Sequence, residues 1–191
     1  LMSGKRTPAQ AISDPGYFDF GGHHFRDDKV GGHGTVDMYR SIVHSCDTYY
    51  YRLANDMGID LIAQTMGEFG FGSKTGIDIE GESSGILPSP EWKKRRFKKP
   101  EQQKWFGGET ISIGIGQGYN AYTMLQLAHA TATVAAGGVM FKPHLVKYIE
   151  SASDGSRRMI EPQPIKTIPI KPEHIETIRR SMVGVNREGT G

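Results

Sequence analysis

The fold of this chain is decided by residues 36–57, which read VDMYRSIVHSCDTYYYRLANDM. Apolar side chains recur here at steps of three and four residues, the spacing of an amphipathic helix. Ser and Asp favour caps and turns over helix interiors, and Ser45-Cys46-Asp47 stands in the middle of the stretch. The pattern therefore predicts helices over about 36–44 and 48–57, joined at this tripeptide, with Thr35 as the first N-cap. Gly58 predicts a stop, and a short helix over 59–68 follows it.

Glycine and proline divide the chain on either side of this stretch. Residues 1–34 are loop-rich, and residues 69–118 are turn-rich, with a strand-like alternation over 111–118. Residues 119–191 predict a helix over 122–136 that is apolar on nearly all faces, and then a strand or hairpin over 139–149. Asp154-Gly155 is typical of a tight turn, and Pro172 opens a last helix to about residue 183.

Composition bounds the class of protein. The chain has 191 residues, 37% of them hydrophobic, which is enough for a packed core and excludes full disorder. A single cysteine excludes an internal disulfide and every zinc motif that needs several cysteines. No apolar run is long enough to span a bilayer. The chain begins at Leu1 without Met or a signal peptide, so we expect a piece of a longer protein whose location this end does not reveal.

One short stretch is strongly basic. Residues 93–96 read KKRR, and Lys98 and Lys99 follow closely. Such a run could contact nucleic acid, but the net charge of the whole chain is only +2, and Glu91 and Glu101 flank the run. The balance favours a solvated loop, and we expect no nucleic-acid partner.

Two accounts fit Ser45-Cys46-Asp47. In the structural account, Asp47 caps a helix by accepting the backbone N–H of Tyr49 or Tyr50, and cap statistics alone favour this account. In the functional account, the tripeptide is the second motif of active-site serine acyl-transfer enzymes. There the Ser45 hydroxyl relays a proton, and Asp47 binds the substrate amide.

Lys74-Thr75-Gly76 matches the third motif of the same enzymes by letter only. It follows Ser45 too closely along the chain and lies in a turn-rich stretch, whereas the functional triplet belongs on a sheet-edge strand well downstream. We therefore interpret it as a turn.

Four residues carry donors that suit zinc: Asp14, Asp27, His33 and Cys46. The short separations from Asp27 to His33 and from His33 to Cys46 permit a loop to fold back onto a helix. Because His and Asp in glycine loops are usually only solvated, residue types alone leave the metal site the less favoured account.

Several phrases, taken in order, resemble the class B penicillin-binding proteins, and most closely their elongation-specific branch. The resemblance extends over about residues 10–150, and more loosely to the end. The phrases are SDPG (13–16), GHG (32–34), SCDTYYY (45–51), DMGID (56–60), FGFG (69–72) with TGID (75–78), WKKRRFKKP (92–100), GIGQG (114–118) and KPHL (142–145).

The resemblance implies a serine-type D,D-transpeptidase that cross-links peptidoglycan stem peptides and is acylated by β-lactams. It implies an inner-membrane anchor in a Gram-negative bacterium, a domain that faces the periplasm, and cell-elongation membrane proteins as partners. The nucleophile motif Ser-x-x-Lys should precede Leu1, and the Lys-Thr-Gly motif should follow Gly191. Ser45 would relay a proton and Asp47 would shape the cleft. The wider family has Asn at the third position, whereas the elongation-specific branch commonly carries Asp.

The same resemblance implies one structural zinc ion per chain, held by Asp14, Asp27, His33 and Cys46 with no open coordination position. It also implies a fold that is mainly α with short β hairpins. This is the helical part of a penicillin-binding, β-lactamase-like transpeptidase domain, without most of the central sheet. Two other hypotheses stay open at this point. One is a non-catalytic, zinc-organised helical module, and the other is a serine hydrolase that uses Ser45 as its nucleophile.

Overall fold

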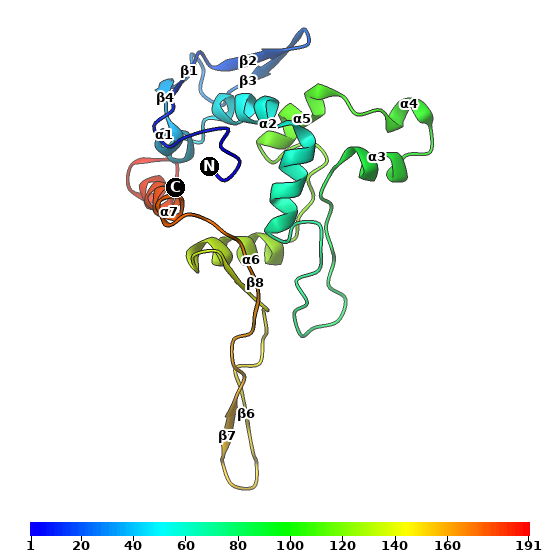
Figure 1. The fold of residues 1–191 in the computed structure, drawn as a ribbon, viewed down its shortest axis with the longest axis vertical. Helices are drawn as coiled ribbons and strands as arrows, with labels where there is room; N and C mark the ends of the chain where they lie inside the picture. Colours follow the sequence, from blue (N-terminus) through cyan, green and yellow to red (C-terminus); the bar gives the residue numbers. More distant parts are fainter.

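A computed structural model describes all residues, 1–191. Helices dominate the molecule, and every strand belongs to one of four separate two-stranded antiparallel sheets (Figure 1). The expected fold class, mainly α with short hairpins and without a central sheet, is confirmed. No helix is both long enough and apolar enough to cross a bilayer.

Residues 1–68 form two small antiparallel sheets and the helices around the Ser45 turn. Strand β1 (Ile12–Asp14) pairs with β4 (Gly34–Val36), and β2 (Tyr17–Phe20) pairs with β3 (His23–Arg26). Helix α1 (Met38–Val43) and helix α2 (Asp47–Glu68) follow. Gly58 has φ 73° and ψ 162°, which breaks α2 into two helical pieces where the sequence predicts the stop. The expected junction between helices at 45–47 is confirmed.

Two expectations about helix capping are wrong. The N-cap of α1 is Asp37, whose Oδ1 accepts the Arg40 N–H at 2.9 Å, and Thr35 belongs to β4. Asp47 does not cap α2, because it is the first helical residue and Cys46 is the N-cap. The Thr48 N–H of that helix end donates instead to Asp27 Oδ2 at 2.7 Å. The carboxylate of Asp27, which is distant in sequence, therefore accepts a backbone N–H at this helix end, the role that was expected of Asp47.

The stretch expected to consist of turns, residues 69–118, contains three helices. They are α3 (Pro90–Arg96), α4 (Pro100–Gln103) and α5 (Gly107–Gly114). Helix α5 takes the place of the expected strand at residues 111–114, and the glycine-rich residues 115–118 follow it as a turn. Its first turn is closed by Glu109, whose side chain accepts the Phe106 N–H at 2.9 Å. Helix α5 packs on α2 so closely that a Cβ on Gly114 would lie 2.4 Å from the Ala54 Cβ. So short an alternation could not distinguish this buried helix from a strand.

The last third of the chain holds the remaining helices and a projecting hairpin. Helix α6 (Met124–Ala135) leads to β5 (Val139–Phe141), which pairs with β8 (Pro164–Thr167). Strands β6 (Tyr148–Glu150) and β7 (Arg157–Met159) form a hairpin that extends away from the body (Figure 1). The turn predicted at Asp154-Gly155 is confirmed, and Gly155 has φ 70°. Helix α7 (Pro172–Glu188) begins at the predicted proline and runs beyond the predicted end at 183.

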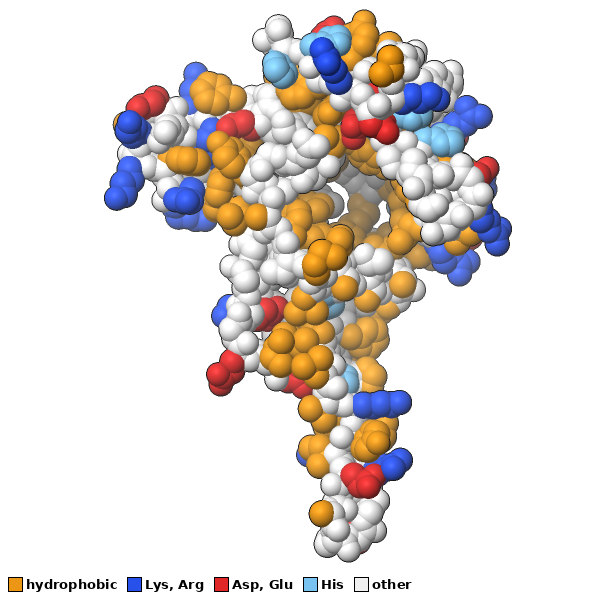
Figure 2. Space-filling model, turned by 180° about the vertical axis from the view of Figure 1, so that it is seen from behind, with side chains coloured by type: hydrophobic (Ala, Val, Ile, Leu, Met, Phe, Trp, Pro, Cys, Tyr) orange, Lys and Arg blue, Asp and Glu red, His pale blue; other side chains and the backbone are white.

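Two helices differ from their expected burial and packing. Helix α6 is not buried on nearly all faces, because Met124 and Leu127 are 79% and 51% exposed. Helix α7 packs against α1, and Gly184 permits this approach, since a Cβ there would lie 2.5 Å from the Tyr39 hydroxyl. Helices α1, α2, α6 and α7 contribute apolar side chains around a cavity of about 270 Å³. The hollow near the centre of Figure 2 opens among orange side chains.

Gln126 joins α6 to the turn-rich segment from a fully buried position. Its Nε2 donates to the carbonyls of Ser73 and Ser84 at 2.7 and 2.8 Å, and its Oε1 accepts the Thr123 N–H at 3.0 Å. We expect Gln126→Ala to lower the free energy of unfolding by about 2–3 kcal/mol, because buried backbone groups lose their partners. Urea unfolding measures this, with exposed Gln102→Ala as the control, expected within about 0.5 kcal/mol of wild type. Equal stability of the two variants would contradict the assignment.

Candidate functional site

Ser45 lies at the turn between α1 and α2 with an unusual backbone. Its φ of 55° makes it the one non-glycine residue of the chain with positive φ. This left-handed conformation costs energy for residues other than glycine, and such positions cluster at functional sites. The side chain is exposed, and its Oγ lies 3.2 Å from the Thr190 Oγ1. Thr190 is its only side-chain hydrogen-bond partner, so no lysine or histidine activates this hydroxyl within the chain.

Ser45 and Asp47 open onto one pocket of about 360 Å³. Ser41, Ile42 and Tyr50 line it from α1 and α2, and Gly114 and Ile115 line it from the end of α5. The structure thus brings the two residues of the predicted motif to a common opening. The α5 wall was not foreseen, because residues 114–115 were expected to end a strand. Their glycine content was the signal available, since it allows close approach of the backbone.

Asp47 is a half-buried carboxylate near other carboxylates. Burial raises its pKa to about 6, and the charges of Asp27 and Asp28 act in the same direction. No hydrogen bond fixes its oxygens, which leaves the side chain free to face the pocket.

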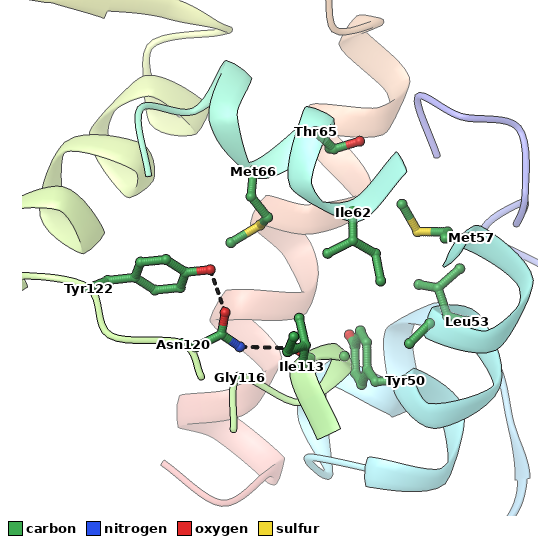
Figure 3. A pocket seen from close by; sticks show the side chains of 12 residues that line it. Tyr50, Leu53, Met57, Ile62, Thr65, Met66, Ile113, Gly116, Asn120 and Tyr122 are labelled. Atoms are coloured by element: carbon green, nitrogen blue, oxygen red, sulfur yellow. Dashed lines mark hydrogen bonds between the residues drawn. The ribbon is translucent and has the colours of Figure 1, made fainter. Parts of the chain in front are cut away.

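A second, apolar cavity of about 220 Å³ adjoins this pocket and shares Tyr50 and Gly114 with it. Figure 3 shows Leu53, Met57, Ile62 and Met66 of α2 directed toward it. Its polar side is made by Asn120, which donates to the Ile113 carbonyl at 3.2 Å and accepts from the Tyr122 hydroxyl at 2.6 Å. These bonds pin the chain after α5 and so fix the α5 wall of the Ser45 pocket.

The four predicted metal ligands lie together beside the Ser45 turn. One donor atom from each of Asp14, Asp27, His33 and Cys46 lies within 4.8 Å of every other. The His33 Nδ1 is 2.9 Å from Asp14 Oδ2 and 3.3 Å from Asp27 Oδ1. The Cys46 Sγ is 3.4 Å from Asp14 Oδ2 and 3.6 Å from Asp27 Oδ2. Tetrahedral zinc with bonds of about 2.0–2.3 Å separates its ligand atoms by about 3.3–3.6 Å, so the observed distances are close to those of an occupied site.

Backbone N–H groups orient both carboxylates. Asp14 accepts N–H groups from Gly16 and His33, each at 2.7 Å, and Asp27 accepts that of Thr48. Burial opposes ionisation of Asp14, but these hydrogen bonds outweigh it and lower its pKa to about 2. Gly32 makes the approach possible, because a Cβ on it would lie 2.2 Å from the Asp14 carbonyl oxygen, and its φ is +77°.

The protein does not neutralise the negative charge of the two carboxylates in this cluster. Asp27 also has a lowered pKa, because hydrogen bonds led by the Thr48 N–H outweigh its burial. Burial raises the pKa of the Cys46 thiol, and the two carboxylates reinforce that shift. His33 is the only basic side chain within 4 Å of either carboxylate. A divalent cation would balance this charge and hold the cysteine as a thiolate, so the donor set fits zinc chemically as well as geometrically.

Lys74-Thr75-Gly76 lies in an irregular segment outside every helix and strand, so it is not on the sheet-edge strand that the functional triplet requires. Glu82 accepts the Thr75 N–H and hydroxyl, each at 2.6 Å, and the Gly76 N–H at 3.0 Å. None of the three residues lines the Ser45 pocket.

Comparison with known proteins gives a consistent result. The whole chain, residues 1–191, matches the penicillin binding protein transpeptidase domain. It is 46% identical to the peptidoglycan D,D-transpeptidase MrdA of Acinetobacter baumannii, over 96% of this chain and 27% of that protein. The chain therefore spans about a quarter of the length of this curated relative.

Solved structures agree with the sequence match. The structure of PBP2 from Pseudomonas aeruginosa in complex with WCK 5153 superposes with a TM-score of 0.77 at 37% identity, covering 95% of this chain and 39% of that one. A complex between PBP2 and MreC from Helicobacter pylori gives a TM-score of 0.77 at 30% identity, covering 95% of this chain and 31% of that one.

Proposed function

This chain belongs to the penicillin-binding protein transpeptidase family, and from that premise we propose that it is part of a serine-type peptidoglycan D,D-transpeptidase of cell elongation. The reaction joins stem peptides, and β-lactams acylate the same enzyme. The observation that carries the proposal is the joint opening of Ser45 and Asp47 onto one pocket beside α5. The name of the A. baumannii relative supports the reaction class.

Within this reaction, Ser45 supplies a hydroxyl that accepts and passes on a proton. A relay needs a neighbour of matched basicity, and we assign that role to the lysine of a Ser-x-x-Lys motif preceding Leu1. Asp47 bounds the same pocket and contacts the substrate backbone. Ser45 as a nucleophile in its own right is disfavoured, because Thr190 is its only side-chain partner and cannot act as a general base.

A zinc ion held by Asp14, Asp27, His33 and Cys46 forms the second part of the proposal. Four protein donors close the coordination shell, as in structural zinc sites. When bound, the ion would supply a fixed positive charge and link the β1–β4 strand pair to the start of α2. Cys46 stands between Ser45 and Asp47, so a fixed sulfur orients both neighbours. A non-catalytic zinc module would not require the shared pocket of Ser45 and Asp47.

We further propose that the full-length protein is anchored in the inner membrane of a Gram-negative bacterium, with this domain in the periplasm. The MrdA relative comes from A. baumannii and the PBP2 structure from P. aeruginosa, which are both Gram-negative. The complex of H. pylori PBP2 with MreC supports cell-elongation proteins as partners.

The isolated 191-residue chain is expected to form no covalent adduct with penicillin, because Ser45 has no base to activate it. Intact-protein mass spectrometry after incubation with a fluorescent penicillin tests this, with the full-length enzyme as the positive control. A stoichiometric mass gain on Ser45 would favour the hydrolase hypothesis. Failure of the full-length enzyme to be acylated would overturn the transpeptidase proposal.

A further inference from the structure

Positive charge is concentrated in residues 91–109. This stretch contains seven of the 23 Lys and Arg residues but only three of the 21 acidic residues, and so carries a net charge of +4. Because the whole chain carries +2, all other residues together carry −2. The small net charge of the whole chain, which favoured the interpretation as a solvated loop, is thus the sum of a positive segment and a negative remainder.

One of these seven cations is structural. Lys93 is buried, with 3% exposure, and its ammonium donates to the Lys104 carbonyl at 2.7 Å and pairs with Glu109. The same ammonium lies 5.8, 5.1 and 5.6 Å from the ring centres of Trp105, Phe106 and Tyr119. Lys93 thus ties α3 to the start of α5. The arm formed by α3 and α4 therefore has a defined shape and is not a loose basic loop.

The other six cations are exposed, and none of them forms an ion pair: Lys94, Arg95, Arg96, Lys98, Lys99 and Lys104. Glu109, an acid of the same stretch, is already paired with Lys93. Figure 2 shows several blue side chains on the arm at the upper left, with orange and a few red ones among them. Phe106 adds a half-exposed aromatic ring that the Lys104 ammonium approaches to 5.6 Å.

The arm connects directly to the Ser45 pocket. Helix α5 starts at Gly107, next to Phe106, and its end supplies Gly114 and Ile115 to the pocket wall. A helix of this length spans about 12 Å. A polymer lying along α5 would therefore reach the pocket and the basic arm together, whereas a small ligand in the pocket would not reach the arm.

We propose that the six exposed cations of the arm, here called the arm cations, form an exosite for carboxylate-bearing stem peptides along the peptidoglycan strand. The inference rests on the proposed function, which makes this polymer the substrate. Exposed charges spread from Lys94 to Lys104 suit a polymer with repeated carboxylates, whereas one small anion would need a buried, convergent cluster. The exosite retains the strand while one of its stem peptides occupies the Ser45 pocket.

The test compares two double charge reversals in the full-length enzyme. Arg95→Glu with Lys98→Glu changes the arm, and Lys147→Glu with Arg158→Glu makes the same change in charge at exposed residues of the β6–β7 region. Cosedimentation with purified peptidoglycan sacculi measures binding. We expect the arm variant to bind about tenfold or more weakly than wild type, and the control variant to bind as wild type. About 0.5 M salt should reduce wild-type binding toward the level of the arm variant.

Other outcomes would overturn the exosite. Equal binding by both variants, or an equal loss in both, would show that the arm cations have no special role. Wild-type binding to anionic phospholipid vesicles but not to sacculi would identify a membrane contact instead. If thermal melting shows that the charge-reversed arm variant is not folded, the neutral variant Arg95→Gln with Lys98→Gln is used in its place. We expect this neutral variant to lose less binding than the charge reversal, but more than the control. Acylation of wild type and the control variant by fluorescent penicillin tests the proposed function separately.

Discussion

Replacing Ser45 by alanine in the full-length enzyme is expected to slow acylation by a β-lactam by about 10²–10⁴-fold, the range contributed by a positioned proton-transfer group. Stability should change little, by about 0.5 kcal/mol or less. The reason is structural: Ser45 caps no helix, its side chain is exposed, and its only side-chain partner is the Thr190 hydroxyl. Stopped-flow or gel-based acylation with fluorescent penicillin, together with thermal melting, measures both effects.

Two further variants separate the hydroxyl from the backbone. Ser45→Gly relieves the positive φ of 55° and also lacks the hydroxyl, so it should be as slow as the alanine variant. Ser73→Ala removes an exposed hydroxyl that makes no side-chain hydrogen bond and should leave acylation unchanged. A normal acylation rate in Ser45→Ala, combined with a lower melting temperature, would show that the residue acts only in the turn.

Replacing Cys46 by alanine is expected to abolish zinc binding and to lower the free energy of unfolding by about 3–4 kcal/mol, the stabilisation given by a ligand present at about 100–1,000 times its Kd. Zinc binding is lost because the variant lacks the thiolate ligand. The free energy of unfolding then falls because Asp14, Asp27 and His33 remain clustered without a bound ion. Elemental analysis of protein purified without chelator should give about one zinc per wild-type chain and none in the variant. Asp28→Ala, an exposed neighbour outside the cluster, should keep the metal.

A chelator distinguishes loss of metal from loss of packing. Cys46 is fully buried in the core beside Val36 and Tyr49, so removal of its sulfur has a small packing cost of its own. EDTA should lower the melting temperature of wild type toward that of the variant and should leave the variant unchanged. Wild-type protein without zinc, in which Cys46 reacts freely with a thiol reagent under native conditions, would contradict the site.

Local signals in the chain were sufficient where a helix is set by its own residues. The break at Gly58 and the start of α7 at Pro172 follow from the glycine and the proline at those positions. The junction at Ser45-Cys46-Asp47 follows from the low preference of Ser and Asp for helix interiors. Sequence reasoning failed where a distant partner decides the local structure. Thr35 does not cap α1, because it belongs to strand β4. Asp47 does not cap α2, and the Thr48 N–H at that helix end donates to Asp27 instead.

In the candidate site, too, some residues could be identified from the sequence and others could not. The residues of the motif and of the metal cluster were identifiable from their types and order, since hydroxyl, thiol, imidazole and carboxylate are chemical properties of single residues. The α5 wall of the pocket was not, because residues 111–114 begin a strand-like alternation, whereas in the structure they form the end of α5, which packs on α2.

The helical character of residues 36–68, the position of the turn and the identity of the donor atoms are therefore encoded locally in the amino-acid sequence. Hydrogen bonds and steric limits that act between near neighbours in the chain dictate these features. Two features arise from the folded arrangement alone. The four donors, from Asp14 to Cys46, lie within 4.8 Å of one another, and Ser45 and Asp47 share an opening with the end of α5. Such meetings depend on contacts between segments that are far apart along the chain, and no local propensity encodes them.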